Sequence, residues 1–315
     1  MGDTKSRIKI IENKSEIGAG TRGSSLGIDA LKVASLNCNS DFFTRHHPIV
    51  LEDFNYKLFD QLKYPKAKRI ESVIEMFEII AGQVSDQLLK NNFPILLSGD
   101  HSCAGGTIAG IKKAYPGKRL GVVWIDAHAD LHSPYTSPTG NLHGMSLATA
   151  LNSDNEDYRV QEIDSATKDL WKKLKSVGNI FPKITTRDLI YVGLRSTEEP
   201  EDYYISNNEI KNINVETVRR NGAESAANDI LNYLSNCDII YISFDVDSMD
   251  CDLISYGTGT PVQNGLTDQE ASSLINHLLI DKRTSCLEIV EINPCLDNKQ
   301  NKMAETSFRI LESAS

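Results

Sequence analysis

Apolar runs of strand length alternate with amphipathic stretches of helix length along most of this chain, and no other feature constrains the fold as strongly. This alternation is typical of a mostly parallel sheet whose crossover connections are helices. The strands are expected at 93–102, 120–130, 188–196, 238–250 and 286–294, and the helices at 69–91, 107–116, 222–236, 267–280 and 302–313. The sequence therefore predicts an α/β fold with a central, mostly parallel sheet flanked by helices on both faces.

The length and composition of the chain fit one domain of this kind. Its 315 residues are 40% hydrophobic, which is enough to bury a large core. Because we find no internal repeat, low-complexity tract or break in composition, we expect a single domain over residues 1–315. The segment 152–187 has the weakest pattern, and we expect a variable excursion there with one helix around "ATKDLWKKLKS".

Charge and cysteine usage exclude several classes of protein. Forty-three acidic residues against 33 basic ones give a formal net charge of −10, without a Lys/Arg cluster suited to nucleic acid or anionic lipid. No stretch approaches the length of a membrane span or the apolar core of a secretory signal. The six cysteines are scattered without a CxxC pair, as is common in reduced proteins. We therefore expect a cytoplasmic protein that binds neither nucleic acid nor membrane.

Polar clusters follow directly after the predicted strands. Five of them stand at strand ends, namely "GDHS", "DAHAD", "GLRS", "SFDVD" and "VEINP". Ligands bind at this edge of an open parallel sheet, because the loops that leave the carboxyl ends of the strands converge there. We therefore expect the five clusters to meet at one site.

Three of these clusters contain residues that we expect to bind metal. Polar residues alternate in "DAHAD" and in "FDVD", so an extended backbone would place each set on one face. With one histidine from "GDHS", the expected ligands are His101, Asp126, His128, Asp130, Asp245 and Asp247. Four neighbouring carboxylates repel one another unless cations neutralise them. We expect two divalent ions, with Asp130 and either Asp245 or Asp247 serving both.

The type of ligand narrows the choice of metal. Carboxylate-rich ligation with one imidazole per ion favours a hard or borderline ion such as Mn²⁺, whereas structural zinc favours cysteine. Two such ions, roughly 3.5–4 Å apart, would share a water and lower its pKa, which makes a hydroxide nucleophile available at neutral pH. The predicted cofactor is two Mn²⁺ per chain.

Taken in order, the motifs resemble those of the ureohydrolase (arginase/agmatinase) family. The matching segments are "SGDHS" (98–102), "DAHAD" (126–130), "GNLHG" (140–144), "SFDVD" (243–247), "GTGTP" (257–261), "GLT" (265–267) and "EINPCLD" (291–297). The opening segment "GAGTRGSSLGIDALKVA" (18–34) is similar as well, so the resemblance extends from about residue 8 to the end. It implies a dinuclear manganese centre on the six ligands named above and hydrolysis of a guanidino group to urea.

The resemblance also implies roles for other residues. His143 matches the family's acid/base histidine and Glu291 matches the carboxylate that receives the guanidinium, so with Asp130 they are the expected catalytic residues. The residues expected to bind substrate are His132, Ser137, Thr139, Asn141, Glu198, Glu201 and Thr260. Family members commonly form trimers or hexamers, and a homo-oligomer is therefore expected.

The resemblance favours L-arginine as substrate, hydrolysed to L-ornithine and urea by a metal-bridging hydroxide that attacks the guanidinium carbon. The hydroxyl-rich loop "SPYTSPT" before "GNLHG" resembles the arginase loop that donates hydrogen bonds to the α-carboxylate, a group that agmatine lacks. Two positions depart from the arginase pattern, with His132 in place of Asn and Glu198 in place of Asp. Agmatine or another guanidino acid therefore stays an alternative substrate. A protein that binds metal and a guanidino ligand without turnover is a further alternative.

Overall fold

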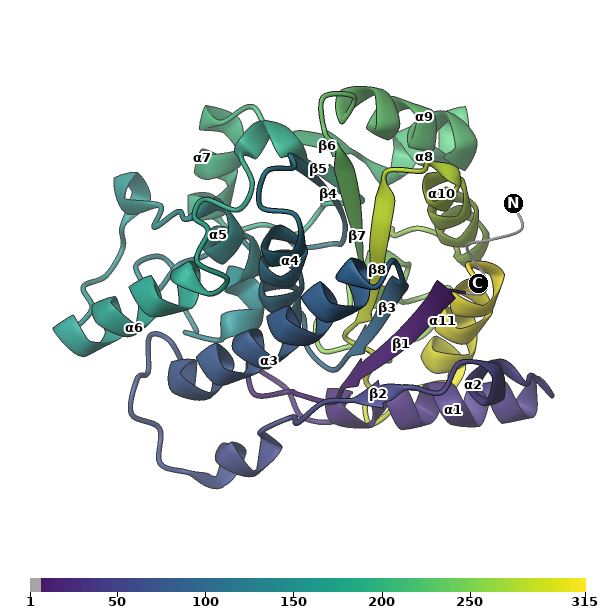
Figure 1. Cartoon of the computed structure of the whole chain (residues 1–315), viewed down its shortest axis with the longest axis horizontal. Coiled ribbons are helices and arrows are strands. Elements are labelled where there is room, and N and C mark those ends of the chain that lie inside the picture. The colour runs from purple at the N-terminus through teal and green to yellow at the C-terminus, as the bar shows by residue number, and fades with distance from the viewer. Residues whose placement is uncertain (1–6) are drawn as a thin grey trace.

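A wholly parallel sheet forms the centre of the molecule (Figure 1). The computed structural model describes residues 7–315, so the first six residues of the predicted domain lie outside the described residues. The strand order is β2-β1-β3-β8-β7-β4-β5-β6. The strands are β1 (Ile8–Asn13), β2 (Ile49–Val50), β3 (Phe93–Ser98), β4 (Leu120–Ile125), β5 (Leu189–Val192), β6 (Lys211–Ile213), β7 (Ile239–Asp245) and β8 (Thr284–Val290).

Helices cover both faces of this sheet, which confirms the predicted fold class (Figure 1). One face packs against α3 (Ile70–Leu89), α4 (Cys103–Ala114), α5 (Ser146–Leu151) and α6 (Ser165–Ser176). The other packs against α1 (Gly27–Asn37), α2 (Phe42–Arg45), α8 (Val215–Asn221), α9 (Ala223–Tyr233), α10 (Asp268–Ile280) and α11 (Lys302–Ser313). Helix α7 (Glu199–Asn207) connects β5 to β6. Among residues 7–315, no helix has the length and apolar character needed to cross a membrane.

Short 3₁₀ helices occupy several of the connections. They are η2 (Ser24–Leu26), η3 (Asn55–Phe59), η4 (Leu142–Met145), η5 (Glu156–Tyr158), η6 (Thr186–Asp188) and η7 (Val246–Ser248). Two of them, η5 and η6, lie in the segment 152–187 together with α6. The single α-helix expected in that segment is therefore confirmed.

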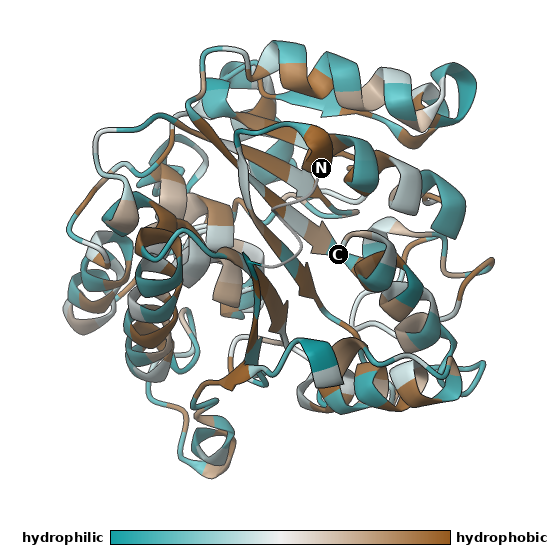
Figure 2. Cartoon of the chain, turned by 45° about the vertical axis from the view of Figure 1, so that its right-hand side comes forward, coloured by the Kyte–Doolittle hydropathy of each residue, from teal (hydrophilic) through white to brown (hydrophobic). Residues whose placement is uncertain are grey.

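Alternating side chains of the strands build two apolar cores. On β4, Val122 and Trp124 face the layer of α3 and α4, while Val123 and Ile125 face the opposite layer, and all four are fully buried. Figure 2 shows the apolar strands in the middle and hydrophilic residues on the outer surfaces of the helices. Each large aliphatic side chain buried in this way contributes about 1.5–3 kcal/mol. Burial on both faces explains why the central strands are continuous apolar runs.

The strands next to the site end earlier than the sequence analysis predicted. Strand β3 ends at Ser98 and β4 at Ile125, so the predicted strands 93–102 and 120–130 are too long. The "GDHS" and "DAHAD" motifs therefore lie in loops, and the idea that an extended backbone aligns the "DAHAD" residues on one face is wrong. The physical reason is visible at Asp130, whose φ of +52° is incompatible with a strand.

Candidate metal centre

Loops at the carboxyl edge of the sheet bring all six predicted metal ligands together. One ligand comes from the loop between β3 and α4, three come from the loop after β4, one is the last residue of β7, and one lies in η7. In that order they are His101, then Asp126, His128 and Asp130, then Asp245, and finally Asp247. The expected convergence at this edge follows from parallel topology, because neighbouring strands end on the same side.

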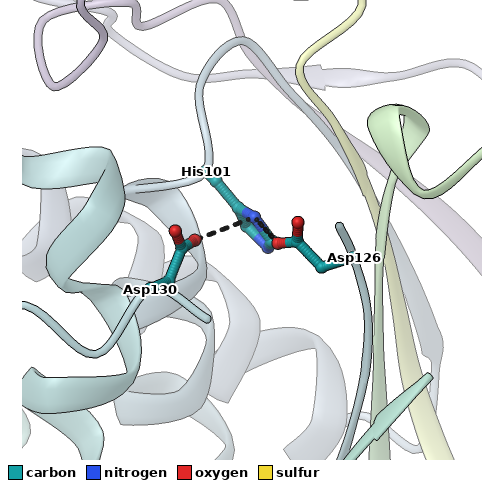
Figure 3. Close-up of side chains that lie close together, drawn as sticks. All are labelled: His101, Asp126 and Asp130. Carbon is teal, nitrogen blue, oxygen red and sulfur yellow. Dashed lines mark ion pairs between the residues drawn. The ribbon is translucent and has the colours of Figure 1, made fainter. Parts of the chain in front are cut away.

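The first group of ligands surrounds the ring of His101. His101 Nδ1 lies 3.0 Å from Asp126 Oδ2, 3.1 Å from Asp130 Oδ2 and 3.2 Å from Asp245 Oδ2. Figure 3 shows how Asp126 and Asp130 approach this ring from two sides. All four side chains are buried, so one nitrogen and three carboxylate oxygens face a common point away from bulk water.

The second group surrounds His128 and shares one residue with the first. His128 Nδ1 lies 3.0 Å from Asp247 Oδ2 and 3.6 Å from Asp126 Oδ1. Asp126 therefore offers one oxygen to each group. The sequence analysis assigned the shared role to Asp130 and to Asp245 or Asp247. In the structure the shared carboxylate is that of Asp126.

The first group fits a metal ion because its ligand atoms lack other partners. His101 Nδ1, Asp126 Oδ2 and Asp130 Oδ2 are buried and have no hydrogen-bond partner. Buried polar atoms without partners cost free energy, so such atoms are normally satisfied. A cation that all three coordinate satisfies them together. The nitrogen and oxygen donors, with no thiolate among them, suit a hard or borderline divalent ion.

The pKa values of both groups show that the site attracts positive charge. Burial, followed by the charges of Asp247 and Asp126, raises the pKa of Asp245 well above its usual range. Burial on its own would lower the pKa of His128, but the charge of Asp247 and the contacts with Asp126 raise it to about 12. A bound cation would supply the positive charge that these shifts favour.

A serine behind His101 determines which ring nitrogen faces the carboxylates. His101 Nε2 lies 2.7 Å from Ser243 Oγ on β7, and the ring stacks on Trp124 at a centroid distance of 4.1 Å. With Nε2–H donated to the serine, Nδ1 is the nitrogen with a free lone pair. The sequence analysis missed Ser243, although its position two residues before Asp245 on one strand face was a usable signal.

Two carboxylates of the site come from residues with left-handed backbone. Asp130 has a φ of +52° and Glu291 a φ of +67°. Residues other than glycine adopt this region at a cost, and they do so preferentially at functional sites. The Glu291 N–H donates to the Gly99 carbonyl at 3.1 Å, which holds this conformation in place.

His143 lies beside the metal ligands and pairs with Glu291. It belongs to η4, and its backbone N–H donates to the Gly18 carbonyl at 3.1 Å. His143 Nδ1 is 3.2 Å from Glu291 Oε1, and the same oxygen accepts the His101 N–H at 2.9 Å. Burial opposes the charged ring, but the hydrogen bond and charge of Glu291 raise the pKa of His143 to about 9. The pairing with Glu291 therefore favours the protonated ring of His143.

His132 lies between a hydroxyl group and two carboxylates. His132 Nδ1 is 3.1 Å from Thr136 Oγ1, while Nε2 is 3.5 Å from Glu198 Oε2 and 3.7 Å from Glu201 Oε2. Glu198 is also the N-cap of α7, and it forms a capping box with the buried Glu201. Burial lowers the pKa of His132 to about 4. The neutral ring therefore already contacts protein groups at both nitrogens.

The polar residues of the loop 137–141 stabilise their own turn. Ser137 Oγ accepts the Gly140 N–H at 2.9 Å, and Thr139 Oγ1 accepts the Asn141 N–H at 3.2 Å. Ser137 is buried and Thr139 is exposed. Asn141 Oδ1 accepts a hydrogen bond from Lys68 Nζ at 3.0 Å. The sequence analysis missed Lys68.

Thr260 and Arg195 both hold the second group of ligands. Thr260 Oγ1 donates to Asp247 Oδ2 at 3.0 Å. The guanidinium of Arg195, from the "GLRS" cluster, donates to the carbonyls of Asp247 and Val262, each at 2.9 Å. Arg195 therefore ties together the loops that follow β5 and β7.

A carboxylate missed by the sequence analysis connects the amino-terminal loop to the site. Asp100 is fully buried, and its two oxygens accept the Gly18 N–H and the Ser102 N–H, each at 2.8 Å. Burial, followed by the charge of Glu291, raises the pKa of Asp100 to about 6. Asp100 stands inside the "GDHS" motif, where only its histidine was selected.

The fold and the site define an α/β protein with a buried cluster of histidine and aspartate residues able to hold metal at the carboxyl edge of a parallel sheet. The sequence profile described as Arginase family matches residues 7–315. The arginase of Bacillus subtilis is 32% identical over 316 residues, which cover 97% of this chain and 96% of that protein. The structure of Bacillus caldovelox arginase has a TM-score of 0.81 at 30% identity, covering 98% of this chain and 97% of that chain. Entamoeba histolytica arginase in complex with L-ornithine has a TM-score of 0.82 at 27% identity, with 98% and 97% coverage.

The chain therefore belongs to the arginase family. Its members are binuclear metal enzymes that hydrolyse guanidino groups, and the resemblance stated from the motifs is confirmed.

Proposed function

We propose that this protein hydrolyses L-arginine to L-ornithine and urea, with two Mn²⁺ held by His101, Asp126, His128, Asp130, Asp245 and Asp247. The observation that supports this most strongly is the set of buried, unpartnered ligand atoms beside the His143–Glu291 pair. We further propose a homo-oligomer, either a trimer or a hexamer, as the family resemblance implies.

Glu291 is the group that we assign to the substrate's guanidinium. When bound, a pair of divalent cations supplies the Lewis acidity that ionises water near neutral pH. The Glu291 carboxylate is buried next to His101, and a planar guanidinium suits paired hydrogen bonds with such a carboxylate. The His101 N–H and His143 hold one of its oxygens, which leaves the other free to orient the guanidino group.

His143 is the proton donor in this proposal. Expulsion of the ornithine amine requires a proton, and a positioned acid supplies it in the transition state. Nδ1 of His143 faces Glu291, so the proton to be transferred is the one on Nε2. The raised pKa of about 9 keeps that proton in place at neutral pH.

The amino-acid end of the substrate is assigned to the loops that follow β4 and β5. We propose that Ser137, Thr139 and Asn141 bind its carboxylate, and that Glu198, Glu201 and His132 form the ammonium side. Thr260, which contacts Asp247, is assigned to the guanidino side. The structure of Entamoeba histolytica arginase supports this assignment, because it contains L-ornithine, which has both a carboxylate and an ammonium at its amino-acid end.

Urea release from L-arginine and agmatine, measured in parallel with the Mn²⁺-loaded protein, tests the proposal. We expect the higher kcat/KM for L-arginine. His143→Ala should lower kcat roughly 10²–10⁴-fold with unchanged manganese content, because it removes the proton donor and no ligand. A preference for agmatine would make the protein an agmatinase, and no urea from either compound would indicate binding without turnover. Loss of manganese from His143→Ala would refute the role given to His143.

A further inference from the structure

The loop 137–141 is held against the segment 65–68 by backbone contacts. The Lys68 N–H donates to the Gly140 carbonyl at 2.8 Å. Gly140 has a φ of +73°, and a Cβ at this position would lie 2.1 Å from the Pro65 carbonyl oxygen. Only glycine permits this close approach. The position of Lys68 relative to the loop is therefore fixed by the main chain, independently of its side chain.

The ammonium of Lys68 is a half-buried positive charge without a carboxylate partner. Its Nζ donates to Asn141 Oδ1 at 3.0 Å. Within residues 7–315 none of the ion pairs involves Lys68, whereas Lys14 and Lys32 each pair with a carboxylate at 2.7 Å. A cation that meets only a neutral amide oxygen can accept a negatively charged ligand without breaking an existing ion pair.

The hydrogen bond from Lys68 also orients the amide of Asn141. Because Oδ1 accepts from the ammonium, the N–H groups of Nδ2 are left as the donors that this side chain can offer. A Cβ at Gly20 would lie 2.6 Å from Asn141 Nδ2 and 4.0 Å from His143 Nε2. Asn141 Nδ2 and His143 Nε2 therefore both lie close to Gly20.

Among residues 7–315, the other predicted substrate-binding side chains on this side of the site are two carboxylates, a histidine and the polar groups of the loop 137–141. The two carboxylates are those of Glu198 and Glu201, and His132 contacts them and Thr136 through its two ring nitrogens. A carboxylate that leaves water for such surroundings needs a positive or strongly donating partner. We infer that Lys68 is a specificity-determining residue, whose ammonium binds the substrate's α-carboxylate together with the Asn141 amide that it orients. The inference rests on the proposed function.

Replacement of Lys68 by Met tests this inference against a matched control. Lys66→Met removes the same charge from the same segment, two residues away. For Lys68→Met we expect kcat/KM for L-arginine to fall roughly 10- to 100-fold, mainly through KM, because a charged hydrogen bond to substrate is lost. Agmatine turnover should change less than about threefold, since agmatine has no carboxylate. Lys66→Met should leave both substrates unaffected, and Lys68→Arg should restore most of the L-arginine activity.

Inhibition by product analogues gives a readout that does not depend on turnover. L-Ornithine should inhibit Lys68→Met more weakly than the native protein, while putrescine, which lacks the carboxylate, should inhibit both equally. Unchanged agmatine turnover shows that the variant folds and binds metal. If the native protein prefers L-arginine and Lys68→Met keeps that preference, the inference is overturned and the proposed function stands. A native protein that does not prefer L-arginine overturns the proposed substrate and the inference together.

Discussion

Tyr241 links the metal ligand His101 to a carboxylate buried inside the sheet. His101 Nε2 contacts Ser243 Oγ at 2.7 Å, and the Ser243 hydroxyl is hydrogen-bonded to the Tyr241 phenol. The Tyr241 hydroxyl donates to Glu288 Oε2 at 2.6 Å. A chain that ends at a carboxylate favours donation away from His101, which would keep Nδ1 unprotonated when a metal ion binds.

Removal of the Tyr241 hydroxyl should weaken metal binding. We expect Tyr241→Phe to lower the affinity for Mn²⁺ roughly 10- to 100-fold, as loss of an outer partner of a metal-binding histidine typically does. Ser98→Ala is the matched control, because Ser98 Oγ donates to the other oxygen of Glu288 at 2.6 Å without leading to His101. Both variants should lose about 1–3 kcal/mol of stability from an unpaired carboxylate oxygen. Calorimetric titration that gives equal Mn²⁺ affinities for both would show that this chain does not act on His101.

The convergence of the six predicted ligands could be anticipated from the sequence because it depends on residue type, local spacing and the position of strand ends. The residues that contact the predicted site residues from distant segments, such as Lys68, could not be predicted. Lys68 lies 73 positions before Asn141, within "KAKRIES", which has no motif of its own. Their contact depends on how two distant segments pack. The sharing of Asp126 between both groups depends on the directions of its two oxygens, which a loop with left-handed residues determines.

Among the strands and helices, the long and buried ones were the easiest to predict from the sequence. Central strands buried on both faces are long apolar runs, whereas β2 and β6 are edge strands of two and three residues that leave no periodic pattern. Helix α11 was expected at 302–313 and spans those residues. Helix α4 begins at Cys103, four positions before its predicted start. The first turn was not predicted because the two glycines of "CAGG" lower its helix propensity. A Cβ at Gly105 would lie 2.3 Å from the Phe77 ring, so close packing against α3 explains the glycine.

A buried lysine that contacts the last turn of α6 makes stability dependent on pH. Lys183 is buried, and its Nζ donates to the Lys175 carbonyl at 2.6 Å. Burial, followed by the charge of Lys175, lowers the pKa of Lys183 from 10.5 to about 8. Between these two values the unfolded state binds more protons than the native state, so this group favours folding increasingly as pH rises through that window and loses the benefit as pH falls through about 8.

A comparison of the native protein with Lys183→Met isolates this effect. The free energy of unfolding of the native protein, relative to that of the variant, should rise by up to about 3 kcal/mol between about pH 7.5 and 10.5. Urea denaturation at several pH values measures the difference. The same change at the exposed Lys172 is the matched control. Parallel pH profiles for the native protein and Lys183→Met would contradict the assignment.

For the whole molecule, the metal centre joins loops from separate parts of the chain. Its ligands follow β3, β4 and β7, and β8 lies between β3 and β7 in the sheet. Ions that bind only the native arrangement of these loops stabilise the fold by mass action. Metal binding at this site is therefore expected to serve both the chemistry of the arginase family and the stability of the central sheet.

The number of metal ions per chain is the most direct test of this account. Two ligand groups that share Asp126 predict two divalent ions per chain, measured by elemental analysis of the active protein after gel filtration. Activity should be highest with Mn²⁺, and the removal of the ions by a chelator should abolish urea release and lower the unfolding temperature, both restored by Mn²⁺. A fully active protein that contains a single zinc ion per chain would contradict the account.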